Sequence, residues 1–311
     1  MSEPALSDWL LQASTPSIRY LTLTRLLDLP ETDPAVRQAW QAMQAEGPIP
    51  AILDQQGETG AWIGEHSFYT PKFTSTHWSM LLLTELSADP ADPCLQLGAR
   101  FMLDTKEKNL LRWFRSDAHG MSCFWGNLLR YTAYSGFQND PRLEGVIASL
   151  TQEVQTGWRC KYSSGEPCAW GAGRALWAFA GLPGNMKTPA VQAAIQSACK
   201  LLLDEHDLMK ADHPIWSKGK PNSLWSRLNF PLFYQMDRLS VLRALAELGL
   251  LDLPGAGPAL DWLEASRAVN GRWTGASPYR RRTWASLGDR LETQRWVSLQ
   301  AALVLNAAHR V

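Results

Sequence analysis

The chain has 311 residues, of which 45% are hydrophobic and 19% charged, and its formal net charge is zero. It can bury a large core, and its balanced charge argues against a general nucleic-acid-binding protein, which needs a basic excess to neutralise phosphates. No apolar run reaches the roughly 20 residues of a transmembrane segment and the N-terminus does not resemble a signal peptide, so we expect a cytoplasmic protein with at most peripheral membrane contact.

Two kinds of helix alternate along the chain. After a short helix over 6–12, the more apolar helices are expected at 17–28, 76–87, 122–135, 168–181, 232–249 and 295–308. Their apolar residues cover more than one face, which is typical of helices with neighbours on both sides. More polar helices follow five dipeptides, which are Asp33-Pro34, Asp92-Pro93, Asp140-Pro141, Thr188-Pro189 and Gly257-Pro258. An Asp or Thr before Pro is a good helix start, because the first turn has unpaired N–H groups and Pro lacks one.

This alternation predicts an all-α protein with an inner and an outer layer of helices. The last inner helix has no outer partner after it, and the N-terminal helix over 6–12 can supply one. We therefore expect a single domain over 1–311, folded as a closed α/α toroid of about six helical hairpins whose N-terminal helix closes on the C-terminal helix. An open solenoid would need polar caps at both ends, and we see none in the sequence.

A Gly-Trp loop follows several of the outer helices. It reads Gln56-x3-Gly60-x-Trp62 in the first case, Arg267-x3-Gly271-x-Trp273 in the last, and Gln155-x-Gly157-Trp158 in a shortened form. Gly permits the left-handed turn that ends a helix. Trp can pack back across the hairpin, and Gln can tie the loop to its neighbour.

This repeat resembles that of squalene–hopene and oxidosqualene cyclases and of the β-subunits of protein prenyltransferases, over most of the chain. The resemblance implies a toroid that acts on or binds a hydrophobic, isoprenoid-type ligand in an aromatic-lined central pocket. The Asp-x-Asp-Asp general acid of those cyclases is absent, as is the Asp-Asp-x-x-Asp cluster of magnesium-dependent terpene synthases.

In such a ring the Gly-Trp loops and the N-termini of the inner helices share one pole, where we expect the working pocket. Asp237, His77 and Tyr234 are the catalytic candidates. Asp237 is expected inside an apolar helix, where burial would raise its pKa and make it a general acid. The alternative is an ion pair of Asp237 with Arg174 or Arg238.

The expected lining of this pocket is aromatic and polar, and aromatic faces can stabilise carbocations. The substrate-binding candidates are Tyr69, Lys72, Trp78, Trp125, Asn127, Trp170, Arg174, Tyr279 and Trp284. For the segment before residue 78, helix capping and loop-tying hydrogen bonds are the alternative. The adjacent Arg280, Arg281 and Arg282 either bind an anion such as a diphosphate or face the acidic first 60 residues.

Three of the five cysteines, Cys123, Cys160 and Cys168, are expected at the same pole, with His77 and with His66, His119 and His213. Thiolate and imidazole are zinc ligands, and the prenyltransferases and lanthionine cyclases that the fold resembles hold zinc at the equivalent pole. Cysteines packed as small hydrophobes, or one thiol nucleophile at a helix N-terminus, are the alternatives. In a cytoplasmic protein the cysteines are expected to be reduced.

The first functional hypothesis is thus a cyclase- or transferase-like enzyme with a hydrophobic small-molecule substrate. A second hypothesis is a non-catalytic ring that binds a lipid or a peptide through the same aromatic pocket. A third is a zinc enzyme that uses the Cys/His site to activate a thiol or a water molecule.

Overall fold

The structure, a computed structural model, describes residues 5–64, 68–114, 120–162, 165–210 and 223–310, with the backbone alone over 105–114. Helices make up the regular structure of this part of the chain, which contains no strand beyond two isolated bridges. The all-α prediction is confirmed. None of the described helices combines the length and the apolar character needed to cross a membrane.

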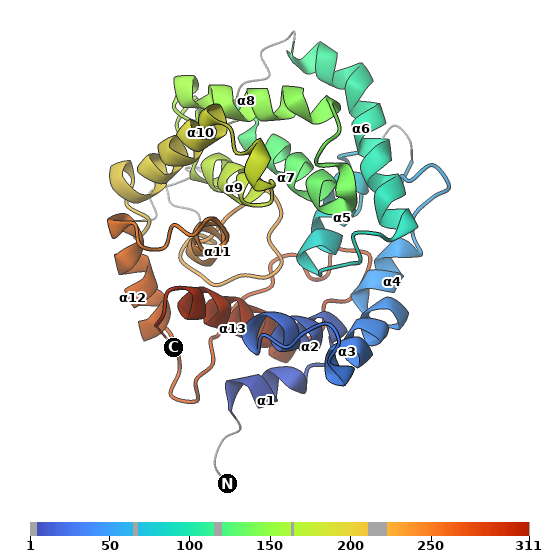
Figure 1. The fold of residues 1–311 in the computed structure, drawn as a ribbon, viewed down its shortest axis with the longest axis vertical. Coiled ribbons are helices and arrows are strands. Elements are labelled where there is room, and N and C mark those ends of the chain that lie inside the picture. Colours follow the sequence, from blue (N-terminus) through green and yellow to red (C-terminus); the bar gives the residue numbers. More distant parts are fainter. Residues whose placement is uncertain (1–4, 65–67, 115–119, 163–164, 211–222, 311) are drawn as a thin grey trace.

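Two layers of helices surround a common centre (Figure 1). The inner layer consists of α2 (Pro16–Leu21, continued by η1, Thr22–Leu26), α5 (Thr76–Glu85), α7 (Ser122–Thr132, continued by η2, Ala133–Phe137), α9 (Ala169–Ala180), α11 (Arg238–Leu248) and α13 (Arg290–Ala307). The outer helices are α1 (Leu6–Leu11), α3 (Pro34–Ala45), α4 (Pro48–Leu53), α6 (Pro93–Phe114), α8 (Arg142–Thr156), α10 (Pro189–Cys199, continued by η4, Lys200–Glu205) and α12 (Gly257–Ala265).

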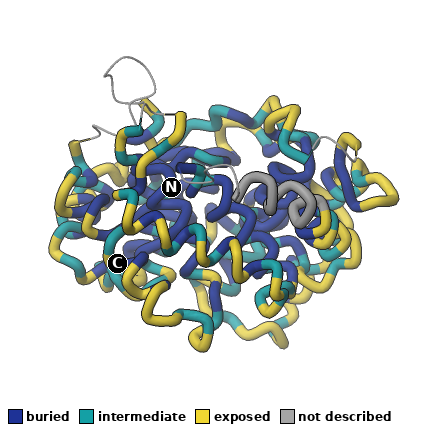
Figure 2. The backbone as a smooth tube through the Cα atoms, turned by 90° about the horizontal axis from the view of Figure 1, so that it is seen from above, coloured by how far each residue is buried: buried dark blue, intermediate teal, exposed yellow. Residues whose placement is uncertain are grey.

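From α5 onward the inner helices pack against one another in chain order. Helix α5 contacts α7, α7 contacts α9, α9 contacts α11, α11 contacts α13, and α13 returns to α2 and η1. Every residue of α9 except Ala180 is buried, whereas α8 buries only Leu143, Val146, Leu150 and Glu153, one stripe of its surface. Figure 2 shows the same contrast between a buried interior and an exposed periphery. The predicted difference between inner and outer helices is confirmed.

Most of the predicted helix starts are confirmed, and two inner helices begin elsewhere. Asp33 and Thr188 accept hydrogen bonds from the first turns of α3 and α10, where Pro is the first helical residue. The helix expected over 232–249 begins only at Arg238, because Asp237 caps it. The helix expected over 295–308 begins earlier, at Arg290, after the cap Asp289.

The tryptophans of the two full Gly-x-Trp loops form matching hydrogen bonds. The indole Nε1 of Trp62 donates to the Ile52 carbonyl and that of Trp273 to the Leu263 carbonyl, both ten residues back and both at 2.7 Å. The backbone N–H of Trp62 donates to the Thr76 hydroxyl of α5. That of Trp273 donates likewise to the Ser298 hydroxyl of α13.

The tie expected from the glutamine of the first loop is also confirmed. Gln56 Nε2 donates to the Gly60 carbonyl at 3.1 Å and to the Cys94 carbonyl of α6 at 2.9 Å. In the last loop Arg267 replaces Gln, and its guanidinium lies 5.8 Å from the centre of the Trp273 ring. In the shortened loop the Trp158 indole donates to Ser197 of α10 instead. Each of these three loops therefore joins its own hairpin to a neighbouring element.

Gly60 and Gly271 provide a matched pair of substitutions. Both have positive φ, 89° and 76°, but a Cβ on Gly60 would lie 2.6 Å from the Leu97 carbonyl oxygen, whereas a Cβ on Gly271 meets no atom within 4 Å. We expect Gly271→Ala to lower the free energy of unfolding by about 1–2 kcal/mol, the cost of the left-handed conformation. Gly60→Ala should lower it by about 1–3 kcal/mol more, because of the steric clash.

Urea denaturation of the wild type and both variants, followed by circular dichroism, measures this difference. Equal losses in the two variants would contradict the close contact of Gly60 with Leu97 of α6.

Candidate functional site

Asp237 links the start of α11 to the loop before it. Its carboxylate accepts hydrogen bonds from the Ser240 N–H (2.7 Å) and hydroxyl, and from the Asn229 N–H and Nδ2, both at 2.9 Å. Asp237 is 1% exposed, and burial raises the pKa of its carboxyl group, against which the bonds from Ser240 and Asn229 act. The rise in pKa agrees with the sequence prediction.

The position predicted for Asp237 was wrong, since this residue is the N-cap of α11 rather than an interior residue. The alternative ion pair is not formed either. Arg174 Nη2 donates to the Gln235 carbonyl at 2.7 Å, and Arg238 Nη2 donates to the Met209 carbonyl at 2.5 Å. Asp237 therefore has a structural role that accounts for both of its oxygens, and its role as a general acid stays a prediction.

Replacement of Asp237 by Asn tests the structural role. An amide has one acceptor oxygen, so its NH₂ group would face donors from either Ser240 or Asn229. We expect Asp237→Asn to lower the free energy of unfolding by about 1–3 kcal/mol. Asp33→Asn is the matched control, because Asp33 accepts one N–H bond, from Ala35, and Asn caps helices as well as Asp does.

Urea denaturation of both variants is the measurement, and the control should stay within about 0.5 kcal/mol of the wild type. An unchanged stability of Asp237→Asn would mean that the four hydrogen bonds contribute little.

The other predicted residues do gather at the pole where the inner helices begin, but several of them are enclosed. His77, Trp78, Trp125 and Asn127 are 0% exposed, so no water-sized space borders them. His77 stacks on Phe124 with ring centres 4.6 Å apart, and its Nδ1 lies 3.2 Å from the Tyr131 hydroxyl. These side chains form the packed base of the pole.

The surface of this pole includes Tyr69, Lys72, Tyr234 and Trp284, which are half-buried or exposed. Lys72 Nζ lies 4.5 Å from the centre of the Tyr234 ring.

Hydrogen bonds fix three of the predicted aromatic residues. The Trp78 indole donates to the Tyr69 carbonyl, the Trp284 indole donates to the Thr74 carbonyl, and the Tyr279 hydroxyl accepts from Gln235 Nε2. Two further predicted residues are buried beside them, Trp170 near Tyr234 (5.8 Å) and Arg174 on α9. The sequence therefore identified a real cluster, most of which is packed against itself.

The three predicted cysteines also come together. The Cys160 and Cys168 thiols are hydrogen-bond partners, and this bond, with burial, raises the pKa of Cys168. Burial raises the pKa of Cys123 to about 12, with a smaller contribution from the nearby Cys160. Thiols with raised pKa are protonated at neutral pH, which is the opposite of what activation of a nucleophile requires.

A zinc site stays a prediction. The described residues contain no group of three or more His, Cys, Asp or Glu placed to hold a metal ion. His66, His119 and His213 lie outside the described residues.

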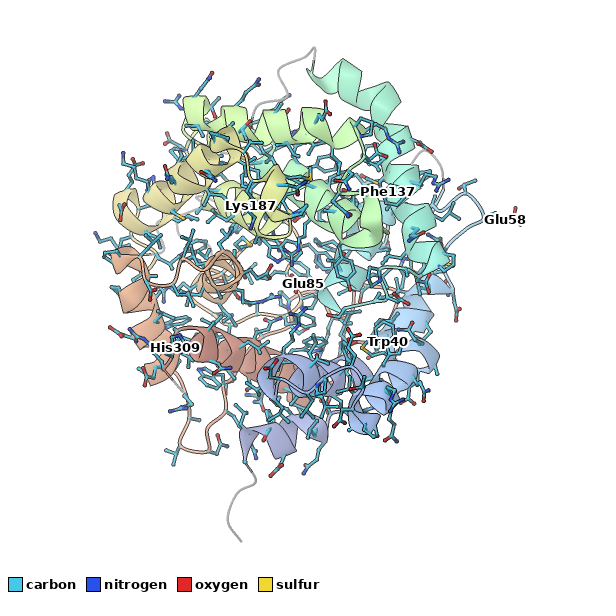
Figure 3. The ribbon with its side chains drawn as sticks, in the orientation of Figure 1. Trp40, Glu58, Glu85, Phe137, Lys187 and His309 are labelled. Carbon is cyan, nitrogen blue, oxygen red and sulfur yellow. The ribbon has the colours of Figure 1, made fainter. Side chains whose placement is uncertain are left out.

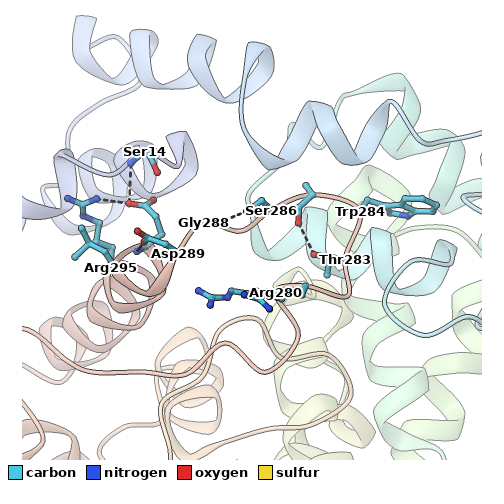
Figure 4. Close-up of a pocket in the computed structure, with 12 residues that line it drawn as sticks. Ser14, Arg280, Thr283, Trp284, Ser286, Gly288, Asp289 and Arg295 are labelled. Carbon is cyan, nitrogen blue, oxygen red and sulfur yellow. Dashed lines mark hydrogen bonds and ion pairs between the residues drawn. The ribbon is translucent and has the colours of Figure 1, made fainter.

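The arginine cluster lines an open pocket of about 880 Å³ at the start of α13 (Figure 4). Arg280 and Arg281 line it together with Trp284 and Asp289, while Arg282 lies over the Phe73 ring. The two ends of the chain meet through Glu292 instead. Its carboxylate accepts the backbone N–H groups of Ser14 (3.2 Å) and Thr15 (2.9 Å) and pairs with Arg295.

A second pocket, which sequence reasoning missed, lies at the other ends of the inner helices. This central pocket has a volume of about 520 Å³ and is lined from all six inner helices of the described chain, for example by Leu21, Glu85, Arg130, Trp177, Arg243 and Trp296. Glu85, the last residue of α5, lies near the middle of the molecule in Figure 3. Most of the lining comes from the C-terminal halves of these helices, opposite the Gly-Trp loops, and Trp296 in the first half of α13 is an exception.

Ion pairs and stacked rings organise the central pocket. Arg243 pairs with Glu85 at 2.9 Å, and Arg130 pairs with Glu247 at 2.7 Å. Arg130 also donates to the Trp177 carbonyl at 3.0 Å, and its guanidinium lies 4.6 Å from the centre of the Trp177 ring. Both charge pairs join non-adjacent helices across the pocket, α5 to α11 and α7 to α11.

A third pocket adjoins the central one. It has a volume of about 740 Å³ and lies between the first hairpin and the connection from α5 to α6. The two pockets share Leu21, Arg25, Ser87 and Tyr134. Tyr134 donates its hydroxyl to the Ala88 carbonyl at 2.5 Å. The central pocket therefore continues outward beside η1.

Comparison with protein-family models and with curated proteins found no match to this chain. The geometry of the pockets therefore has to support any proposal about function.

Proposed function

We propose that this protein is a closed α/α toroid, of the fold group of terpene cyclases and protein prenyltransferases, that holds a hydrophobic ligand in its central pocket. The observation that supports the proposal is the lining of one pocket by all six inner helices of the described chain. In a ring, only the central space is reached by every inner helix.

Contacts between the chain ends support closure of the ring. Helix α13 packs on α2 and η1. The Arg295 guanidinium of α13 lies 5.3 Å from the Trp9 ring of α1, and Glu292 binds the backbone of Ser14 and Thr15. These contacts support the N-terminal helix as the outer partner of α13.

The size and lining of the central pocket suit a small hydrophobic molecule. Ligand pockets commonly have volumes of about 300–1,000 Å³ and an apolar lining with a few polar groups, and this one has about 520 Å³. Its apolar side is built by Trp177, Trp296, Leu299, Leu303 and Val304. The resemblance of the Gly-x-Trp repeat makes an isoprenoid the first ligand class to test.

We favour binding over catalysis in this proposal. His77 is enclosed, and both oxygens of Asp237 are occupied by hydrogen bonds. Neither residue lines the central pocket, whose charged side chains are arginines and glutamates. A binding role needs no reacting group, whereas the enzymatic hypothesis needs Asp237 to exchange a proton with a ligand.

A substitution that fills the central pocket tests the proposal. Ala246 of α11 lines this pocket and is half-buried, so the indole of Ala246→Trp would occupy part of its volume. We expect the wild type to bind the uncharged isoprenoid alcohol farnesol saturably, at one molecule per chain. Ala246→Trp should weaken binding by roughly tenfold or more, because it displaces apolar contact area.

The matched control is Ala148→Trp, which adds the same indole to an exposed position of α8. Isothermal titration calorimetry measures all three proteins. Equal weakening in both variants would place binding outside the central pocket, and a wild type that binds no farnesol would contradict the proposal for isoprenoids.

The zinc hypothesis keeps one specific support, the approach of Cys160 to Cys168 with Cys123 nearby. Elemental analysis of protein purified without chelators tests it. About one zinc ion per chain, lost in Cys168→Ser, would support a zinc enzyme. A metal content near zero in the wild type would leave these thiols as packing groups.

A further inference from the structure

The inner ring holds more positive than negative charge around the central pocket. Three arginines line the pocket, Arg25, Arg130 and Arg243, against two glutamates, Glu85 and Glu247. The two glutamates are paired with Arg243 and Arg130. Arg25 is thus the one arginine of this lining that is not paired with a lining glutamate in the described structure. The adjoining pocket that Arg25 also lines adds Arg37, Glu31 and Asp89.

A fourth arginine lies directly behind the pocket wall. The guanidinium of Arg174 lies 5.2 Å from the centre of the Trp177 ring, and Trp177 lines the pocket. Arg174 is 2% exposed, and within the described residues it has no ion pair. Its hydrogen bond goes to a neutral carbonyl, that of Gln235. Burial lowers the pKa of Arg174 only to about 10, so the group stays charged at neutral pH.

Burial of a cation costs several kcal/mol in desolvation. The charge of Glu85 partly offsets this cost for Arg174, but Glu85 is already paired with Arg243. An anion in the central pocket would add negative charge near both Arg174 and Arg25.

We infer that the ligand of the central pocket is an amphipathic anion, whose carboxylate or phosphate group binds Arg25 and whose apolar part packs on Trp177, Trp296 and Leu303. The inference rests on the proposed function, because it concerns the same pocket, and it adds the chemical class of the ligand.

Arg25 is the arginine best placed to bind the acidic group. It belongs to η1 and lines both the central pocket and the adjoining one, so it lies where the two meet. It is exposed, and it forms no ion pair in the described structure. By contrast, Arg130 already binds Glu247 and the Trp177 carbonyl through Nη1. A free guanidinium offers a carboxylate or a phosphate two parallel N–H donors.

Three probes with the same twelve-carbon chain separate the apolar and the charged contributions. They are dodecanoate, dodecyl phosphate and dodecanol, each used below the concentration at which it aggregates. By isothermal titration calorimetry we expect the wild type to bind at least one anion roughly tenfold to a hundredfold more tightly than the alcohol, the range of a hydrogen bond to a charged group. The anion preferred distinguishes a carboxylate from a phosphate ligand.

Arg25→Gln should remove this preference and leave the affinity for dodecanol unchanged. The matched control is Arg37→Gln, which makes the same change in charge at an exposed arginine that lines the adjoining pocket but not the central one. Arg37→Gln should keep the preference. Circular dichroism and thermal unfolding of both variants check that each is folded.

The outcomes distinguish the inference from the proposed function. Equal affinity of the wild type for the alcohol and both anions would overturn the anionic ligand and leave a hydrophobic pocket. Anion preference that persists in Arg25→Gln, or is lost equally in Arg37→Gln, would overturn the assignment to Arg25. Failure of all three probes to bind the wild type would contradict the proposed function itself, and the inference with it.

Discussion

Burial of the inner helices on nearly every side is the constraint on which the rest of this structure depends. A helix with inner neighbours on both flanks and an outer helix behind it has little surface left for water, as the buried length of α9 shows. Any polar group on such a helix must then find a partner within the protein. Thr84 and Thr132 bond carbonyls one turn back in their own helices. Asn127 reaches the Phe233 carbonyl on the segment before α11.

The same requirement explains how successive hairpins are joined. Thr76 and Ser298 lie on buried inner helices, and each hydroxyl accepts the backbone N–H of a Gly-x-Trp tryptophan. Loop and helix therefore satisfy each other's polar groups in one bond. Glu292 joins the ends of the chain in a similar way. Its carboxylate accepts hydrogen bonds from two backbone N–H groups at the start of α2 and pairs with Arg295.

The sequence predicted the repeat well because each repeat carries its own local signals. Pro34 and Pro189 mark helix starts, and Gly60 and Gly271 mark left-handed turns, independently of what surrounds them. The length of an inner helix is less local. Asp237 ends the loop before α11 because Asn229, eight residues earlier, folds back to bind it, and no pattern within the helix announces that contact.

The central pocket was missed for a related reason. Its residues lie on six separate helices, and only the folded arrangement of these helices brings them together around one pocket. A signal did exist, since Arg130 directly follows Leu128 and Leu129, and Arg243 lies between Leu242 and Ala244. The tryptophan-rich loops predicted a pocket at the opposite pole, where aromatic residues such as Trp78 and Trp125 are buried packing groups.

The positions of the arginines along their helices explain how the pocket can hold them before any ligand arrives. Arg130 lies in the last turn of α7, and Arg25 lies in the last turn of η1. Helix C-termini carry partial negative charge, which favours cations within the last turn. This attraction stabilises the guanidinium groups without using up their N–H donors. Under the inference above, an anion bound to Arg25 would leave the ion pairs of Glu85 and Glu247 intact.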